Sequence, residues 1–183
     1  PHVIFPRVVS ILDHGVYFKP ILEGITISIG GLTEEIFKES SKAFLLWCNR
    51  LHAEGKTEVI HTIMSTMLEI MDNHSKDTRV TLPVLKTIDL MYKKGAFGDK
   101  VSDTATTEYN ILKTIKSEMN QCGDVMKLIA CINVIFHLLS RSGNVRHFAL
   151  RSLLMLLGHK YPRIRKYTAE QLYVHFISDN DSI

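Results

Sequence analysis

The sequence predicts an all-α protein built as an α-solenoid of helical hairpins, with about nine helices in its 183 residues. Apolar residues recur at the spacing of one helix face in seven successive stretches. The breaks between these stretches are mostly short and carry glycine, asparagine and other turn residues. A spacing of roughly 40 residues per helix pair is typical of HEAT/armadillo-like repeats. A closed helical bundle is the alternative, because it also covers helices that are apolar on several sides.

The first part of the chain predicts three helices, near residues 3–12, 17–29 and 37–51. The apolar face of the third helix comprises Phe37, Ser40, Phe44, Trp47, Cys48 and Leu51. Thr33 is a natural N-cap for this helix, because its hydroxyl can accept from a free N–H of the first turn. Glu34 and Glu35 follow, where negative charge suits the positive helix start. Gly30-Gly31 predicts a turn in which the second glycine is free to adopt a positive φ.

Three further stripes, each a row of apolar residues along one helix face, cover residues 60–71, 84–92 and 109–119. Met64, Met67 and Met71 share one helix face, and we interpret them as core residues rather than as an adaptable methionine-rich binding surface. The longer polar break over residues 95–107 predicts a flexible loop. Its aromatic residue, Phe97, either contacts a partner or packs on its own helix.

The last three stripes cover residues 125–139, 145–156 and 164–176. Pro162 suits the first turn of the final helix, because its missing N–H would be unpaired there anyway. With Ile164, Arg165, Ala169 and Leu172 it forms the pattern of a HEAT second helix. We expect Ala169 to permit close approach of the partner helix and Arg165 to point along the repeat interface toward an acceptor.

Composition places the chain among ordinary globular proteins, with 45% hydrophobic residues and a net charge of +3. The three cysteines show neither disulfide nor zinc spacing and predict reduced core thiols in the cytosol. No signal peptide pattern is present, and the apolar run over residues 125–139 is too short to span a membrane. Because the chain starts at Pro1 rather than Met, we expect a fragment of a longer protein, with residues 1–183 forming one HEAT-like domain.

Three stretches together resemble the C-terminal region of the tubulin-folding cofactor D family. Residues 24–34 read GITISIGGLTE, and Arg79-Val80 is followed by PVLKTID over residues 83–89. Residues 161–166 read YPRIRK and continue into TAEQLY over residues 168–173. The third stretch alone is close to a generic HEAT pattern, and the first two make the resemblance specific.

The resemblance implies a non-catalytic scaffold that binds β-tubulin and works with tubulin cofactors C and E and an ARF-like small GTPase. That machinery assembles and dismantles the αβ-tubulin dimer. The GTPase chemistry linked to the family belongs to its partners, and the implied location is the cytoplasm, in association with the cytoskeleton. A HEAT-type scaffold in transport or signalling is the alternative function.

The C-terminal part of the sequence is strongly basic. Residues 141–175 hold seven Lys or Arg against Glu170 alone, a net +6 in a chain that totals +3. We interpret Arg165 and Arg146 as structural. We predict that Arg151, Lys160, Arg163 and Lys166 face solvent and bind a partner, and an acidic partner such as tubulin would be attracted to them. The alternative is a solvated helix face with structural arginines.

The sequence carries no catalytic, cofactor or metal signature. It has no nucleophile elbow, no kinase motif set and no Cys–His pairing signal. No two of the nine histidines are spaced i, i+4, and Gly30-Gly31 belongs to no phosphate-binding loop. The basic end lacks the interleaved aromatic residues of a nucleic-acid-binding module. We therefore expect no enzyme activity, cofactor, metal or nucleic-acid partner.

Overall fold

The computed structural model describes residues 1–31, 33–96, 104–141 and 143–180. Within these ranges the chain forms nine α-helices and no strand. The α-helices are α1 (Ile4–Ser10), α2 (Phe18–Ile29), α3 (Glu34–Ala53), α4 (Thr57–Asn73), α5 (Thr78–Lys93), α6 (Thr104–Met119), α7 (Val125–His137), α8 (Gly143–Leu156) and α9 (Pro162–Asn180). Short 3-10 turns are η1 (Ile11–Asp13), η2 (Gly15–Tyr17) and η3 (Leu138–Ser140).

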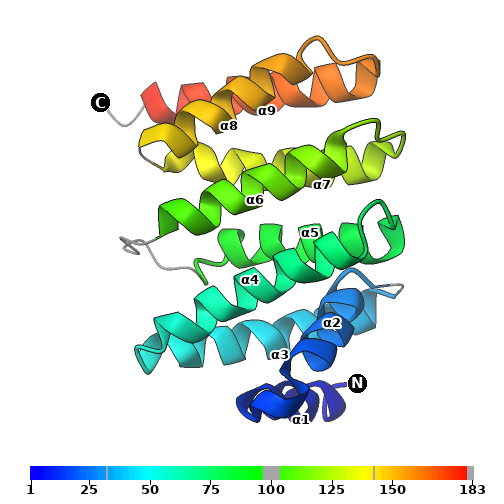
Figure 1. Cartoon of the computed structure of the whole chain (residues 1–183), viewed down its shortest axis with the longest axis vertical. Helices are drawn as coiled ribbons and strands as arrows, with labels where there is room; N and C mark the ends of the chain where they lie inside the picture. Colours follow the sequence, from blue (N-terminus) through cyan, green and yellow to red (C-terminus); the bar gives the residue numbers. More distant parts are fainter. Residues whose placement is uncertain (32, 97–103, 142, 181–183) are drawn as a thin grey trace.

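The helices stack along the longest axis of the molecule, with the two chain ends at opposite ends of the stack (Figure 1). The hairpins α4–α5, α6–α7 and α8–α9 follow one another. Helices α4, α6 and α8 pack side by side in one layer, and α5, α7 and α9 pack in the other. At the N-terminal end, α1 packs on α3, and α2 packs on both α3 and α5. This arrangement confirms the predicted all-α solenoid, in which each hairpin contacts its neighbours.

The core runs along the whole stack rather than filling one centre. The predicted methionine stripe of α4 lies inside it, with Met64, Met67 and Met71 all buried. Cys48 and Cys131 are also fully buried free thiols. Burial raises the pKa of the Cys48 thiol to about 12, so this cysteine stays protonated and behaves as a small core residue.

Side-chain caps start three of the helices. The Thr33 hydroxyl accepts from the Ile36 N–H at 3.3 Å, as predicted. Asp77 caps α5 by accepting from Arg79 N, and Asp124 caps α7 by accepting from two N–H groups of its first turn. Each cap satisfies a donor that the helix start leaves free, which defines where these helices begin.

Two glycines end helices in the left-handed conformation. Gly55 follows α3 with φ +69°, and Gly95 follows α5 with φ +67°. After Gly55, the Lys56 N–H bonds to the Leu51 carbonyl, and after Gly95 the Ala96 N–H bonds to the Met91 carbonyl. These bonds satisfy the last carbonyls of the helix, and a glycine reaches the required φ without steric cost.

Several predicted positions differ from the structure. Phe37 was expected on the buried face of α3, yet it is 44% exposed, because it lies in the first turn beside an open cleft. Ala169 was expected to face a partner helix, but it is exposed. Helix α9 is the last helix of the described stack, so one flank of it meets no described neighbour. The predicted loop is shorter than expected, because α6 begins at Thr104; residues 97–103, including Phe97, lie outside the described part.

Candidate functional site

The predicted basic residues are distributed along the α8–α9 hairpin. Arg151 lies on α8, Lys160 in the turn, and Arg163 and Lys166 in the first turns of α9. All four are exposed. The Lys160 ammonium lies 4.9 Å from the Tyr161 ring centroid. We call these four residues the basic cluster; three of them lie on helices.

Few carboxylates neutralise this end of the molecule. From residue 109 to residue 170 the chain holds ten Lys or Arg and three acidic residues. Glu118 is buried and paired inside the fold, and Asp124 caps α7. Glu170 lies 3.7 Å from Lys166, in an exposed pair that contributes little to stability. The surface around α8 and α9 therefore presents mostly positive charge.

The two arginines interpreted as structural are not buried. Arg165 is exposed, and its guanidinium donates to the carbonyls of His159 at 2.9 Å and Lys160 at 3.3 Å. It thus finds acceptors in its own turn, where it stabilises the α8–α9 connection, instead of lying along the repeat interface as expected. Arg146 is exposed as well. Burial lowers the pKa of His159, and the nearby charges of Lys160 and Arg165 lower it further.

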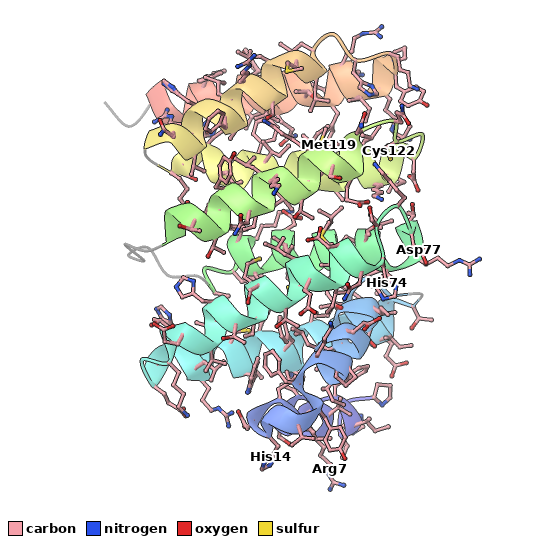
Figure 2. The ribbon with its side chains drawn as sticks, viewed as in Figure 1. Arg7, His14, His74, Asp77, Met119 and Cys122 are labelled. Atoms are coloured by element: carbon pink, nitrogen blue, oxygen red, sulfur yellow. The ribbon has the colours of Figure 1, made fainter. Side chains whose placement is uncertain are left out.

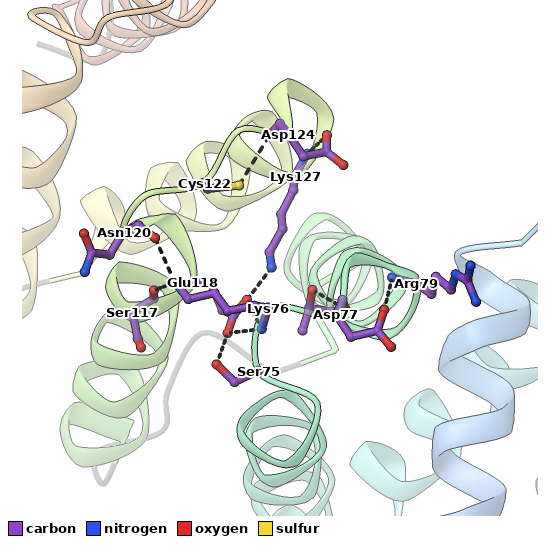
Figure 3. Close-up of polar contacts among 11 residues, drawn as sticks. Ser75, Lys76, Asp77, Arg79, Ser117, Glu118, Asn120, Cys122, Asp124 and Lys127 are labelled. Atoms are coloured by element: carbon purple, nitrogen blue, oxygen red, sulfur yellow. Dashed lines mark hydrogen bonds and ion pairs between the residues drawn. The ribbon is translucent and has the colours of Figure 1, made fainter.

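A buried ion pair joins Lys127 on α7 to Glu118 on α6, and each side chain is 2% exposed. Figure 3 shows the Lys127 ammonium pointing at the Glu118 carboxylate. Burial by itself would raise the pKa of Glu118, but hydrogen bonds from Lys127, Ser75 and the Lys76 N–H outweigh it, and the pKa is lowered. Sequence reasoning missed this pair; its only signal was a lysine within an apolar run.

The same carboxylate connects two hairpins of the stack. Ser75, in the α4–α5 turn, donates to Glu118 at 2.9 Å, and the Lys76 N–H lies 3.2 Å from both carboxylate oxygens (Figure 3). The Lys76 ammonium donates in turn to the carbonyls of Ser117 and Asn120 at the end of α6. Because these contacts satisfy most acceptors of Glu118, the pair orders the joint between neighbouring hairpins.

A second polar cluster lies between α5 and α7. Asp89 is 2.8 Å from the His137 ring nitrogen and 2.7 Å from the Lys93 ammonium. Burial alone would raise the pKa of Asp89, but these two partners hold it below its usual range. The Tyr92 ring stacks on His137 at 5.2 Å, and burial raises the pKa of Tyr92. These contacts join α5 to α7, and Asp89 and Lys93 also line a cleft at the surface.

The two most distinctive resemblance stretches meet in space. Gly30 ends α2 directly against Pro83 of α5, and a Cβ on Gly30 would lie 2.3 Å from the Pro83 Cβ. The expected turn is present, but neither glycine has a positive φ. Neither position has room for a Cβ, since one on Gly31 would lie 2.3 Å from the Ser28 carbonyl oxygen. Close approach of neighbouring atoms is therefore the physical reason for glycine at both positions. A cleft of about 430 Å³ opens beside them, lined by Phe37 among other residues.

The described ranges show no group of three or more His, Cys, Asp or Glu side chains that could hold a metal ion. Within the same ranges, no helix combines the length and apolar character needed to cross a bilayer. The described residues offer exposed helix surface, exposed positive charge on α8 and α9, and clefts such as the one beside Gly30 and Gly31.

Comparison with known proteins finds a matching family and a more distant relative. A family model described as "Tubulin folding cofactor D C terminal" matches residues 1–127. The chain is also 23% identical over 179 residues to Tubulin-specific chaperone D of Dictyostelium discoideum. That alignment covers 91% of this chain and 12% of the relative, so the chain spans a small part of the relative's length. No solved structure matches the chain.

Proposed function

Because the chain belongs to the tubulin folding cofactor D family, we propose that it is a non-catalytic scaffold segment of a tubulin chaperone in the cytoplasm. Residues 1–183 would act as one HEAT-like unit. The segment would bind β-tubulin, or the cofactors E and C and the ARF-like GTPase implied by the resemblance, while αβ-tubulin dimers are assembled and dismantled. Its mechanism would be capture by shape and charge on stacked helices.

The observation that carries the proposal is the exposed positive charge of the basic cluster, Arg151, Lys160, Arg163 and Lys166, on the α8–α9 hairpin. Positive potential on a fixed surface attracts an acidic protein and increases its association rate. This cluster lies beyond residue 127, outside the part that the family model matches. A direct experiment must therefore assign a partner to it.

The test measures αβ-tubulin binding by the wild-type chain and by the double variant Arg163→Glu/Lys166→Glu. Lys38→Glu/Lys42→Glu on α3 is the matched control, since it reverses two exposed charges four residues apart on another helix. We expect the first variant to bind about tenfold more weakly, equivalent to ~1.4 kcal/mol, and the control to bind like wild type. Equal affinity of all three proteins, with unchanged melting temperatures, would remove the basic cluster from the binding surface.

The same assay separates the alternatives. A HEAT-type scaffold in transport or signalling would bind neither αβ-tubulin nor cofactor E nor the small GTPase in parallel pull-downs. A nucleic-acid-binding protein would bind an oligonucleotide with an affinity that falls steeply with salt, by a log–log slope of about −0.9 per phosphate neutralised. Weak binding that does not depend on salt would dismiss that second alternative.

A further inference from the structure

A groove of about 530 Å³ lies between α6 and α8, in the layer shared by α4, α6 and α8. Its lining includes Lys116, Met119, Leu128, Met155, Leu156 and His159. Figure 2 places Met119 near the C-terminal end of α6, beside the turn that holds Cys122. The methionines of α4 that the sequence singled out are buried elsewhere, so this groove, which we call the α6–α8 groove, is a different methionine surface.

The α6–α8 groove has an apolar floor and an exposed apolar rim. Leu128 and Leu156 are buried at its base, while Met155 is 72% exposed. Methionine is flexible and polarisable, so it adapts to the shape of an apolar partner. Farther along the same two helices, Tyr109 and Phe148 meet edge to face at 6.0 Å, and both are exposed. Met155 lies seven positions after Phe148, which is about 10 Å or about two turns along α8.

The charges around the groove are positive. Lys116 lies 5.7 Å from the Phe148 ring centroid, and Lys160 follows His159 in the next turn. The acidic residues near Lys116 in the sequence are already engaged: Glu118 is paired with Lys127, Asp124 caps α7 and Glu108 is paired with Arg141. An apolar ligand that carries negative charge on its flanks would therefore complement both the floor and the rim.

The backbone of the groove walls favours a helix as the ligand. The walls are α-helices, whose N–H and C=O groups are bonded within each helix, so an extended peptide would find no strand edge to pair with. At the end of α6, the carbonyls of Ser117 and Asn120 already accept from Lys76. A ligand that satisfies its own backbone, as a helix does, loses no hydrogen bonds when it enters.

We propose that the α6–α8 groove binds an acidic amphipathic helix of a partner protein. Apolar side chains at i, i+3 or i+4 and i+7 enter between Met119 and Met155, and acidic residues beside them face Lys116 and Lys160. The groove goes beyond the proposed tubulin role, because a partner unrelated to tubulin with this chemistry would fit it equally well.

The test uses a labelled synthetic helix of about 18 residues, or five turns, with leucines on one face and glutamates elsewhere. Fluorescence anisotropy compares the wild-type chain with Met155→Glu and Lys116→Glu. Met126→Glu on α7 and Lys42→Glu on α3 are matched controls at exposed positions outside the groove. We expect each groove variant to weaken binding at least about tenfold, or ~1.4 kcal/mol, and each control to leave it unchanged.

Three results would overturn the proposal. The first is no saturable binding of the synthetic helix by the folded wild-type chain at up to about 1 mM. The second is equal binding of a peptide with the same composition in scrambled order, which has no apolar face. The third is a loss of binding in Lys116→Glu but not in Met155→Glu, together with displacement by an oligonucleotide, which would assign the surface to simple charge attraction. Tubulin binding of the groove variants, measured separately, keeps this proposal distinct from the previous one.

Discussion

Replacing Gly30 by alanine tests the contact between the two most distinctive resemblance stretches, residues 24–34 and 83–89. Gly30 has φ −71°, an ordinary helical value that alanine adopts without strain. The problem is space, because the new Cβ would lie 2.3 Å from the Pro83 Cβ, 2.5 Å from its Cα and 2.6 Å from its Cγ. Pro83 is held within α5 and its ring cannot rotate away. Helices α2 and α5 must therefore move apart to accept a single methyl group.

The expected cost follows from the overpacking of a well-packed contact, which is typically about 1–3 kcal/mol. For a chain of this length, each kcal/mol corresponds to a melting temperature lower by about 2–4 °C. Gly24 provides the matched control, because it lies inside the same helix and its added Cβ meets nothing within 4 Å. Gly24→Ala should stabilise the chain by about 0.5–1 kcal/mol, since alanine loses less entropy in a helix.

Urea unfolding followed by far-UV circular dichroism measures both variants against wild type. The decisive result is that the two substitutions change the free energy of unfolding in opposite directions. A general effect of alanine in or next to α2 would change it in the same direction for both. If Gly30→Ala were as stable as wild type or more stable, the close packing of α2 on α5 would be wrong. The contact between the two resemblance stretches, residues 24–34 and 83–89, would then have no structural basis.

Other predictions concern the buried polar and thiol groups. Lys127→Met leaves the Glu118 carboxylate buried without its partner and should cost about 3–5 kcal/mol, whereas Lys42→Met at an exposed site should change the unfolding free energy by no more than about 0.5 kcal/mol. The pKa of Glu118 is lowered, so its stabilisation is complete above its ordinary pKa of about 4.3 and is lost as the pH falls through its lower folded-state pKa. Urea midpoints across a pH series should thus show the deficit of Lys127→Met shrinking in acid, and a constant deficit would contradict the ion pair. Cys48 and Cys131 are buried with raised thiol pKa values, so an aromatic disulfide reagent should modify them only after unfolding; rapid reaction of all three cysteines in the native chain would refute their burial.

Local features of the chain were predictable because their causes are local. Helix periodicity identified the stripes that became α3 to α9, and Thr33 and Pro162 marked two helix starts correctly. A hydroxyl before a helix and a proline in its first turn act within a few residues, so a sequence reveals them. The exposure of the basic cluster was likewise predictable from the sequence, whereas its binding to a partner stays a prediction.

The sequence by itself determined which segments are helical and which face of most helices is apolar. Only the tertiary structure decided which neighbours each face meets. A lysine inside an apolar run could not be recognised as half of a buried ion pair until α6 brought Glu118 to Lys127. Gly30 could not be recognised as a contact point until α5 brought Pro83, 53 residues away in the sequence, against it. Periodicity reports that a face is covered, but burial of a charge or contact with a glycine depends on the shape and chemistry of the element that covers it.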